Sequence, residues 1–180
     1  MIGRWATDSR PVRRTARADP EDGVAASADA AHAAALHLLT ARARTRAELE
    51  RRLQQRGFEP GAIAETLDRL AAVGLIDDDA LARDLAASRA AQGVDASVIA
   101  VELRDRGVDP AVAVGAAESA APAEEREERC REVARGHLAK LQGVSPQARF
   151  RRLAAYLTRR GYPPDVVEAV VSELVDLSHP

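Results

Sequence analysis

The sequence has few aromatic residues, one cysteine and no long apolar run. Aromatic residues make up 3% of the 180 residues although 46% are hydrophobic, and alanine supplies much of that share. Because alanine favours helices while aromatic and β-branched residues favour strands, this composition predicts an all-α protein and argues against a β-sandwich. The single cysteine, Cys130, cannot form an internal disulfide, which fits a reducing compartment.

Signals for membranes and secretion are also missing. No apolar run approaches the roughly 20 residues that a membrane-spanning helix needs. Residues 1–23 lack the apolar centre of a signal peptide. We therefore expect a cytoplasmic protein that does not contact a membrane.

Catalytic motifs are absent as well. The four histidines are scattered, and none stands beside a serine or cysteine nucleophile in a known motif. There is no GxxxxGK[ST] loop for a nucleotide and no CxxC pair for a metal. We expect no enzymatic activity, no cofactor and no metal site.

The first 29 residues differ from the rest of the chain. They carry five basic and five acidic side chains among Pro, Gly, Ala and Ser, without an apolar period. Such a segment buries too little surface to offset its ordering entropy, so we expect a disordered tail over residues 1–29. From residue 30 onward the apolar residues follow helical spacing.

One phrase occurs three times, as LQQRGFEP (53–60), LRDRGVDP (103–110) and LTRRGYPP (157–164). Its leucine lies on an apolar helical stripe, its glycine can adopt the left-handed conformation, and its proline is tolerated in a first helical turn. Each phrase therefore predicts a helix end, a tight turn and a helix start. In such a Schellman turn the apolar residue after the glycine packs on the leucine, as Phe58 on Leu53. The arginine before each glycine would meet the negative end of the helix dipole.

Helical patterns flank each phrase on both sides and complete a unit of three short helices. In the first unit Leu36, Leu39 and Ala43 form the expected apolar stripe of the first helix. The phrases begin 50 and 54 residues apart, a spacing typical of helical repeat arrays. We predict an extended, curved array of three repeats at 30–74, 75–121 and 122–180, the last with a short C-terminal end.

The stretch GLIDDDALA, residues 74–82, joins the first two units. Either Asp77 or Asp78 can cap the next helix by accepting a hydrogen bond from a free amide. A metal site is the alternative interpretation, but nothing elsewhere supplies the remaining oxygen ligands.

Together, the three-helix units, the GLIDDDALA junction, the AELERRLQQRGF stretch and the RRGY turn resemble the RecX family. The resemblance covers residues 30–176 and implies a non-catalytic, monomeric regulator that binds the recombinase RecA and its filament on DNA. It further implies that the protein inhibits recombinase and ATPase activity in DNA repair. Two departures, Leu81 in place of a frequent Phe and the small residues at 114–121, affect the packing of the second unit.

Charge is distributed unevenly along the chain. Residues 42–56 hold six Arg against two Glu, residues 145–160 hold five Arg and no acid, and residues 57–130 hold seven basic and sixteen acidic groups. Arg binds phosphate through a bidentate fork. We therefore predict that two groups of basic residues bind a protein partner or DNA phosphates, and that the contact with DNA is weak. Their members are Arg44, Arg46, Arg51, Arg52, Arg149, Arg151, Arg152, Tyr156, Arg159 and Arg160.

In the third unit, Arg149, Arg152, Tyr156 and Arg159 are predicted to share one exposed stripe, because they recur at steps of three and four. The simpler alternative is a solvated helix face. A second functional alternative is a sequence-independent DNA-binding protein, because helix, Gly turn and helix resemble a helix-turn-helix unit. However, the helices after the glycine turns are acidic or apolar, which suits a DNA groove poorly.

Overall fold

The computed structural model describes residues 20–175, with side chains from residue 27, and it confirms an all-α repeat fold. Residues 1–19 of the predicted tail lie outside this range. Within it the α-helices are α1 (Pro20–Ala41), α2 (Arg46–Gln54), α3 (Pro60–Ala72), α4 (Asp78–Ala91), α5 (Ala96–Asp105), α6 (Pro110–Ala120), α7 (Arg126–Leu138), α8 (Pro146–Arg159) and α9 (Pro164–Leu174). Short 3₁₀ turns, Ala123–Glu125 and Ala139–Leu141, flank α7.

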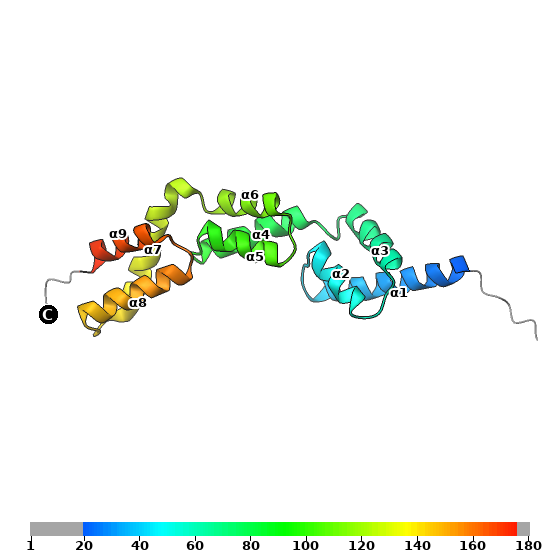
Figure 1. The fold of residues 1–180 in the computed structure, drawn as a ribbon, viewed down its shortest axis with the longest axis horizontal. Coiled ribbons are helices and arrows are strands. Elements are labelled where there is room, and N and C mark those ends of the chain that lie inside the picture. Colours follow the sequence, from blue (N-terminus) through cyan, green and yellow to red (C-terminus); the bar gives the residue numbers. More distant parts are fainter. Residues whose placement is uncertain (1–19, 176–180) are drawn as a thin grey trace, which may run out of the picture.

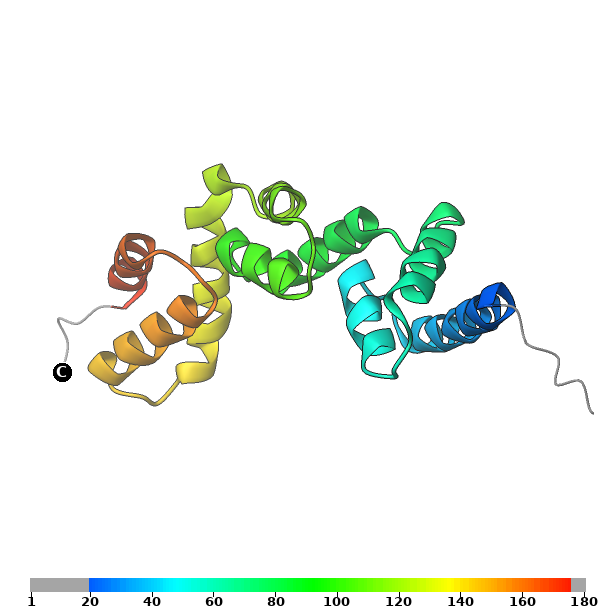
Figure 2. The same ribbon diagram turned by 45° about the vertical axis from the view of Figure 1, so that its right-hand side comes forward.

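The helices form three trios that follow one another in a curved row (Figures 1 and 2). We call α1–α3 the first trio, α4–α6 the second and α7–α9 the third. Each trio has its own apolar core, with buried Leu53, Leu103 and Leu157 at equivalent places. The repeat limits predicted above, at 74/75 and 121/122, stay predictions.

The repeated phrase folds as its residues predict. Gly57, Gly107 and Gly161 have φ angles of +84°, +87° and +91°, in the left-handed region. The next residue donates its amide proton to the carbonyl of the phrase leucine, at 3.3, 3.1 and 3.4 Å, as in a Schellman turn. The helices α3, α6 and α9 then begin at the phrase prolines. The prediction of helix end, turn and helix start is confirmed.

Helix α1 differs from the prediction at its start. It begins at Pro20, so assigning residues 20–29 to a disordered tail was wrong. Within this segment, residue 28 packs on α3. Ala28 is buried and its carbonyl accepts a hydrogen bond from the hydroxyl of Thr66 at 3.3 Å.

The buried face of α1 also differs from the predicted stripe. Small residues, Ala28, Ala31 and Ala35, lie against α3 together with Leu38. Leu36 is 38% exposed, and Ala43 follows the end of the helix. The first trio thus uses alanines and Leu38 for close helix packing, and of the predicted stripe only Leu39 packs, partly buried, on the core.

The structure shows which of the two candidate aspartates caps α4. Asp77 caps α4, accepting a hydrogen bond from the Ala80 amide at 2.8 Å. Asp78 instead accepts one from the Arg46 amide of the first trio at 2.9 Å. One aspartate therefore starts a helix and its neighbour joins two trios.

In the second trio, α6 packs through small residues, with Ala113, Ala116 and Ala117 buried, and Leu81 is half-buried. No helix between residues 20 and 175 combines the length and apolar character required to cross a membrane.

Candidate partner and nucleic-acid interface

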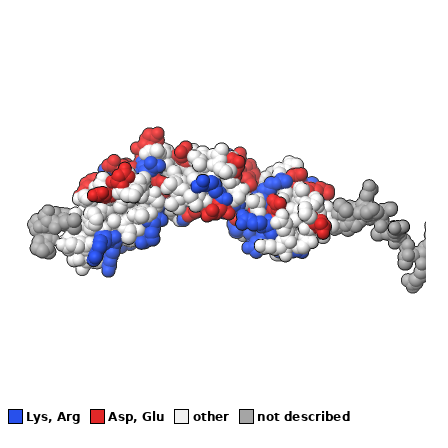
Figure 3. Space-filling view, viewed as in Figure 1, with Lys and Arg blue, Asp and Glu red and all other residues white. Residues whose placement is uncertain are grey.

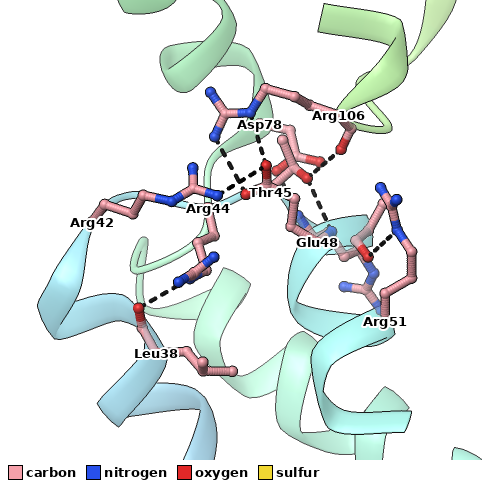
Figure 4. Close-up of polar contacts among 10 residues, drawn as sticks. Leu38, Arg42, Arg44, Thr45, Glu48, Arg51, Asp78 and Arg106 are labelled. Atoms are coloured by element: carbon pink, nitrogen blue, oxygen red, sulfur yellow. Dashed lines mark hydrogen bonds and ion pairs between the residues drawn. The ribbon is translucent and has the colours of Figure 1, made fainter. Parts of the chain in front are cut away.

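The first and second trios meet where the glycine turn after α5 lies against the start of α2 (Figure 4). A Cβ atom added at Gly107 would stand 2.3 Å from the Cβ of Ala47, so only glycine fits this contact. The hydroxyl of buried Thr45 donates to the carbonyl of Arg106 at 2.6 Å and accepts from the Glu48 amide at 3.1 Å. Thr45 thereby caps α2 and fastens the next trio to it.

An ion pair closes the same junction. Arg106 donates to both carboxylate oxygens of Glu48, at 2.9 and 3.3 Å, and Arg42 approaches Glu48 at 3.4 Å (Figure 4). Burial alone would raise the pKa of Glu48, but the hydrogen bond and charge of Arg106 outweigh it and the pKa lies below its ordinary value. Glu48 is therefore held ionised between two guanidinium groups.

Beside this pair is a groove of about 330 Å³ between the two trios. We call it the junction groove. Its charged lining consists of Arg42, Arg44, Glu48, Arg51, Arg52, Asp105 and Arg106. Five arginines and two carboxylates leave an excess of three positive charges, an environment that attracts anions.

The junction groove brings together three of the four arginines predicted for the first unit, Arg44, Arg51 and Arg52. Arg46 is not in its lining, and its guanidinium pairs with Asp68 at 2.6 Å. Arg42 and Arg106 were not selected from the sequence. Arg106 was assigned only to the helix dipole, and nothing local shows that its phrase docks on the preceding trio.

Arg44 is half-buried at the edge of the first trio. Its Nε donates to the Leu38 carbonyl at 3.1 Å, which holds the half-buried side chain in place (Figure 4). Burial, followed by the nearby charge of Arg42, lowers its pKa. In contrast, Arg51 and Arg52 are exposed along α2.

A second basic surface lies on α8. Arg151, Arg152 and Arg159 line a depression of about 360 Å³ together with His137. We call these three arginines the α8 patch. The predicted exposed stripe of Arg149, Arg152, Tyr156 and Arg159 was wrong in part, because Tyr156 is half-buried and so is Arg149. Its guanidinium turns back to donate to the Val144 carbonyl at 3.3 Å, and its Nε is buried.

Tyr156 and Arg160 are engaged in contacts at the junction of the second and third trios. The Tyr156 ring stacks on His137, with centroids 3.7 Å apart, and Arg160 lies over the same ring at 4.6 Å. Arg160 also donates to the carbonyl of Gln92 in the second trio. Burial, together with Lys140 and Arg160, lowers the pKa of His137. The structure thus places these predicted site residues in a stack that joins trios.

The two basic surfaces face the same side of the array. In Figure 3 blue patches of Lys and Arg lie low on the third trio and near the meeting of the first two, and Asp and Glu are frequent along the upper edge, with a further acidic group low in the middle of the array. The lower edge is the inner side of the bend seen in Figure 1.

Known proteins share this architecture. Residues 31–70 match the first three-helix domain of RecX, and residues 124–171 match its third three-helix domain. The crystal structure of RecX from Lactobacillus salivarius superposes with a TM-score of 0.67 at 22% identity, covering 83% of this chain and 97% of that one. At that identity the likeness shows the fold alone.

Sequence similarity to curated relatives is closer. The regulatory protein RecX of Mycolicibacterium smegmatis is 40% identical over 176 residues, which cover 92% of this chain and 93% of that protein. The regulatory protein RecX of Thermobifida fusca is 38% identical, with coverage of 93% and 89%. This chain belongs to the RecX family of regulatory proteins.

Proposed function

We propose that this protein is a cytoplasmic, monomeric regulator that binds RecA and its filament on DNA and lowers recombinase and ATPase activity. Membership of a family of regulatory proteins supports it. The observation that carries the proposal is the placement of two basic surfaces, the junction groove and the α8 patch, on one edge of an elongated array.

In this proposal the array lies along the filament and contacts more than one subunit. The basic surfaces contact acidic protein surface or DNA phosphates, and the acidic middle contacts basic protein surface. A chain bound across subunits resists filament extension and the conformational cycling that accompanies ATP hydrolysis.

The protein acts by binding and without chemistry of its own. Its one thiol, Cys130, is fully buried, and burial raises its pKa to about 11, so the thiol stays protonated at neutral pH. A protonated, inaccessible thiol is a poor nucleophile.

The test is the DNA-dependent ATPase rate of the cognate RecA in the presence of increasing amounts of this protein. We expect inhibition below one molecule per RecA. The triple variant Arg151→Glu, Arg152→Glu, Arg159→Glu should need about tenfold more protein, because it reverses charges at the proposed interface. The matched control reverses three exposed arginines outside both surfaces, Arg56, Arg83 and Arg104, and should inhibit like the wild type.

Melting temperatures of both triple variants should stay close to that of the wild type, since all six arginines are exposed. If the ATPase rate is unaffected while the protein binds bare DNA tightly and salt weakens that binding steeply, the regulator proposal is wrong. The second interpretation, a sequence-independent DNA-binding repeat protein, would then hold.

A further inference from the structure

The junction groove is assembled from two trios. The first trio supplies four of its arginines, at positions 42, 44, 51 and 52, and the second trio supplies Arg106 from the glycine turn after α5. We propose that the junction groove is a phosphate-binding site that is complete only while the first and second trios are docked. This deepens the proposed function by naming a ligand for one basic surface, and its test needs no RecA.

The positive charge of the groove is not balanced within the protein. Among the described residues, Arg44, Arg51 and Arg52 have no carboxylate within ion-pair distance, and Glu48 is shared by Arg42 and Arg106. An anion in the groove would therefore meet guanidinium groups that have no other ionic partner. It would also relieve the repulsion among them.

The chemistry of the lining suits an oxyanion such as phosphate. All five cations are arginines, and the planar guanidinium matches two oxygens of a phosphate at once. The five arginines come from the chain after α1, from α2 and from the turn after α5, and all of them line the same groove. The same chemistry suits a phosphodiester of a nucleic-acid strand and a small diphosphate.

Docking of the trios decides whether this arrangement exists. The fit of Gly107 against Ala47 and the hydrogen bond from Thr45 to the Arg106 carbonyl place Arg106 at the groove. A ligand that binds only the docked arrangement must stabilise that arrangement. By linkage, a substitution that opposes docking must lower the affinity for the ligand. Phosphate binding and the shape of the array are thereby coupled.

The first experiment is titration calorimetry of the full chain at constant ionic strength, with pyrophosphate and with a short single-stranded oligodeoxythymidine as probes. The pair Arg51→Gln, Arg52→Gln should lower pyrophosphate affinity about tenfold, the equivalent of about 1.4 kcal/mol. The matched control is a pair of exposed arginines outside both basic surfaces, Arg83→Gln, Arg104→Gln, which should change that affinity less than about twofold.

The second experiment separates docking from charge. Gly107→Ala should lower the affinity for pyrophosphate several-fold more than Gly57→Ala does. Both glycines have positive φ, but a Cβ atom at Gly57 meets nothing within 4 Å. If Gly107→Ala does not fold, Ala47→Leu opposes the same contact from the other side and should weaken binding equally. Circular dichroism checks that each variant keeps its helices.

The outcomes are distinct. The proposed site would be overturned if neither probe binds. It would also be overturned if pyrophosphate binds the wild type and the Arg51→Gln, Arg52→Gln variant with equal affinity. Equal binding by the Gly57 and Gly107 variants would overturn its dependence on docking. Displacement of pyrophosphate by the oligonucleotide identifies a nucleic-acid phosphate as the ligand, and binding of pyrophosphate alone identifies a small phosphate compound. A protein that binds phosphate yet leaves the RecA ATPase unchanged would refute only the proposed function.

Discussion

The two junctions between trios use the same geometry but different chemistry. In each, the glycine turn of the later trio lies against the first turn of the middle helix of the earlier one. Gly107 lies against Ala47 of α2, and Gly161 lies against Ser97 and Val98 of α5. The first junction is closed by the ion pair between Glu48 and Arg106 beside an open groove, whereas the second is built around a buried carboxylate.

Asp95 is the centre of the second junction. Its side chain is 1% exposed, caps α5 by accepting from the Ser97 amide at 3.0 Å and accepts from Arg126 of the third trio at 2.8 Å. Its own amide donates to the Arg160 carbonyl at 2.8 Å. Nearby, Gly93 lies so close to Val133 that an added Cβ would stand 2.4 Å from it. Buried polar and apolar contacts together predict a stiff connection.

One repeated turn thus forms two junctions with different physical properties. Buried ion pairs are screened by salt much less than pairs that lie beside an open, arginine-rich groove. We infer that the second junction fixes the curvature of the array and that the first is the place where a ligand can change it.

The largest effect is expected from Asp95→Ala. It removes a helix cap and leaves Arg126 without its buried partner, so we expect the free energy of unfolding to fall by about 3–5 kcal/mol. Thr45→Ala, at the equivalent cap of the first junction, should cost about 1–2 kcal/mol. Urea unfolding followed by circular dichroism measures both.

Asp109→Ala is the control for Asp95→Ala. Asp109 caps α6 in the same way, with its carboxylate accepting from the Ala111 and Val112 amides. However, it is exposed, and within residues 27–175 it makes no hydrogen bond or ion pair with another trio. A loss of about 1 kcal/mol is expected there. Equal losses in the two aspartate variants would show that the second junction contributes nothing beyond a cap.

A smaller effect should separate Gly161→Ala from Gly57→Ala. Both substitutions force a side chain into a left-handed turn at a cost of about 1–2 kcal/mol. At Gly161 the new methyl group would also stand 2.5 Å from Val98, which adds about 1–3 kcal/mol of overpacking. Thermal unfolding of the two variants measures the difference, and identical melting temperatures would contradict a tightly packed second junction.

These glycines also show what the sequence can and cannot predict. The turns at Gly57, Gly107 and Gly161 were predictable because a leucine, a glycine and a proline within eight residues determine them. Their contacts were not, because the residues that meet Gly107 and Gly161 lie some 60 residues earlier, at Ala47 and Ser97. Three nearly identical phrases therefore have two different roles, which the phrase itself does not encode.

The candidate site, too, could be predicted from the sequence only in part. A run of arginines on α2 was visible in the sequence, but its completion by Arg106 depends on how two trios dock. Helical spacing placed Arg149 on the exposed face of α8, yet a long, flexible side chain can turn back to a local carbonyl, here that of Val144. Periodicity gives the direction of a Cβ atom and leaves the position of a guanidinium undetermined.

The smallest predicted effect tests the ionic character of the first junction. In the folded protein the pKa of Glu48 lies below its ordinary value. Its contribution to the free energy of unfolding is therefore fully present above the pKa that it has in the unfolded chain, and is lost as pH falls through its lower pKa in the folded protein. Glu48→Gln should therefore cost about 1 kcal/mol at pH 7, and nearly nothing once acid has protonated the wild-type carboxylate. Burial raises the pKa of Asp78, so this residue changes stability with pH in the opposite direction. Because both proteins contain Asp78, its effect cancels in the difference between their free energies of unfolding. Urea unfolding of both proteins across this pH range gives that difference directly, and a cost of Glu48→Gln that does not change with pH would mean that packing, and not charge, holds the first two trios together.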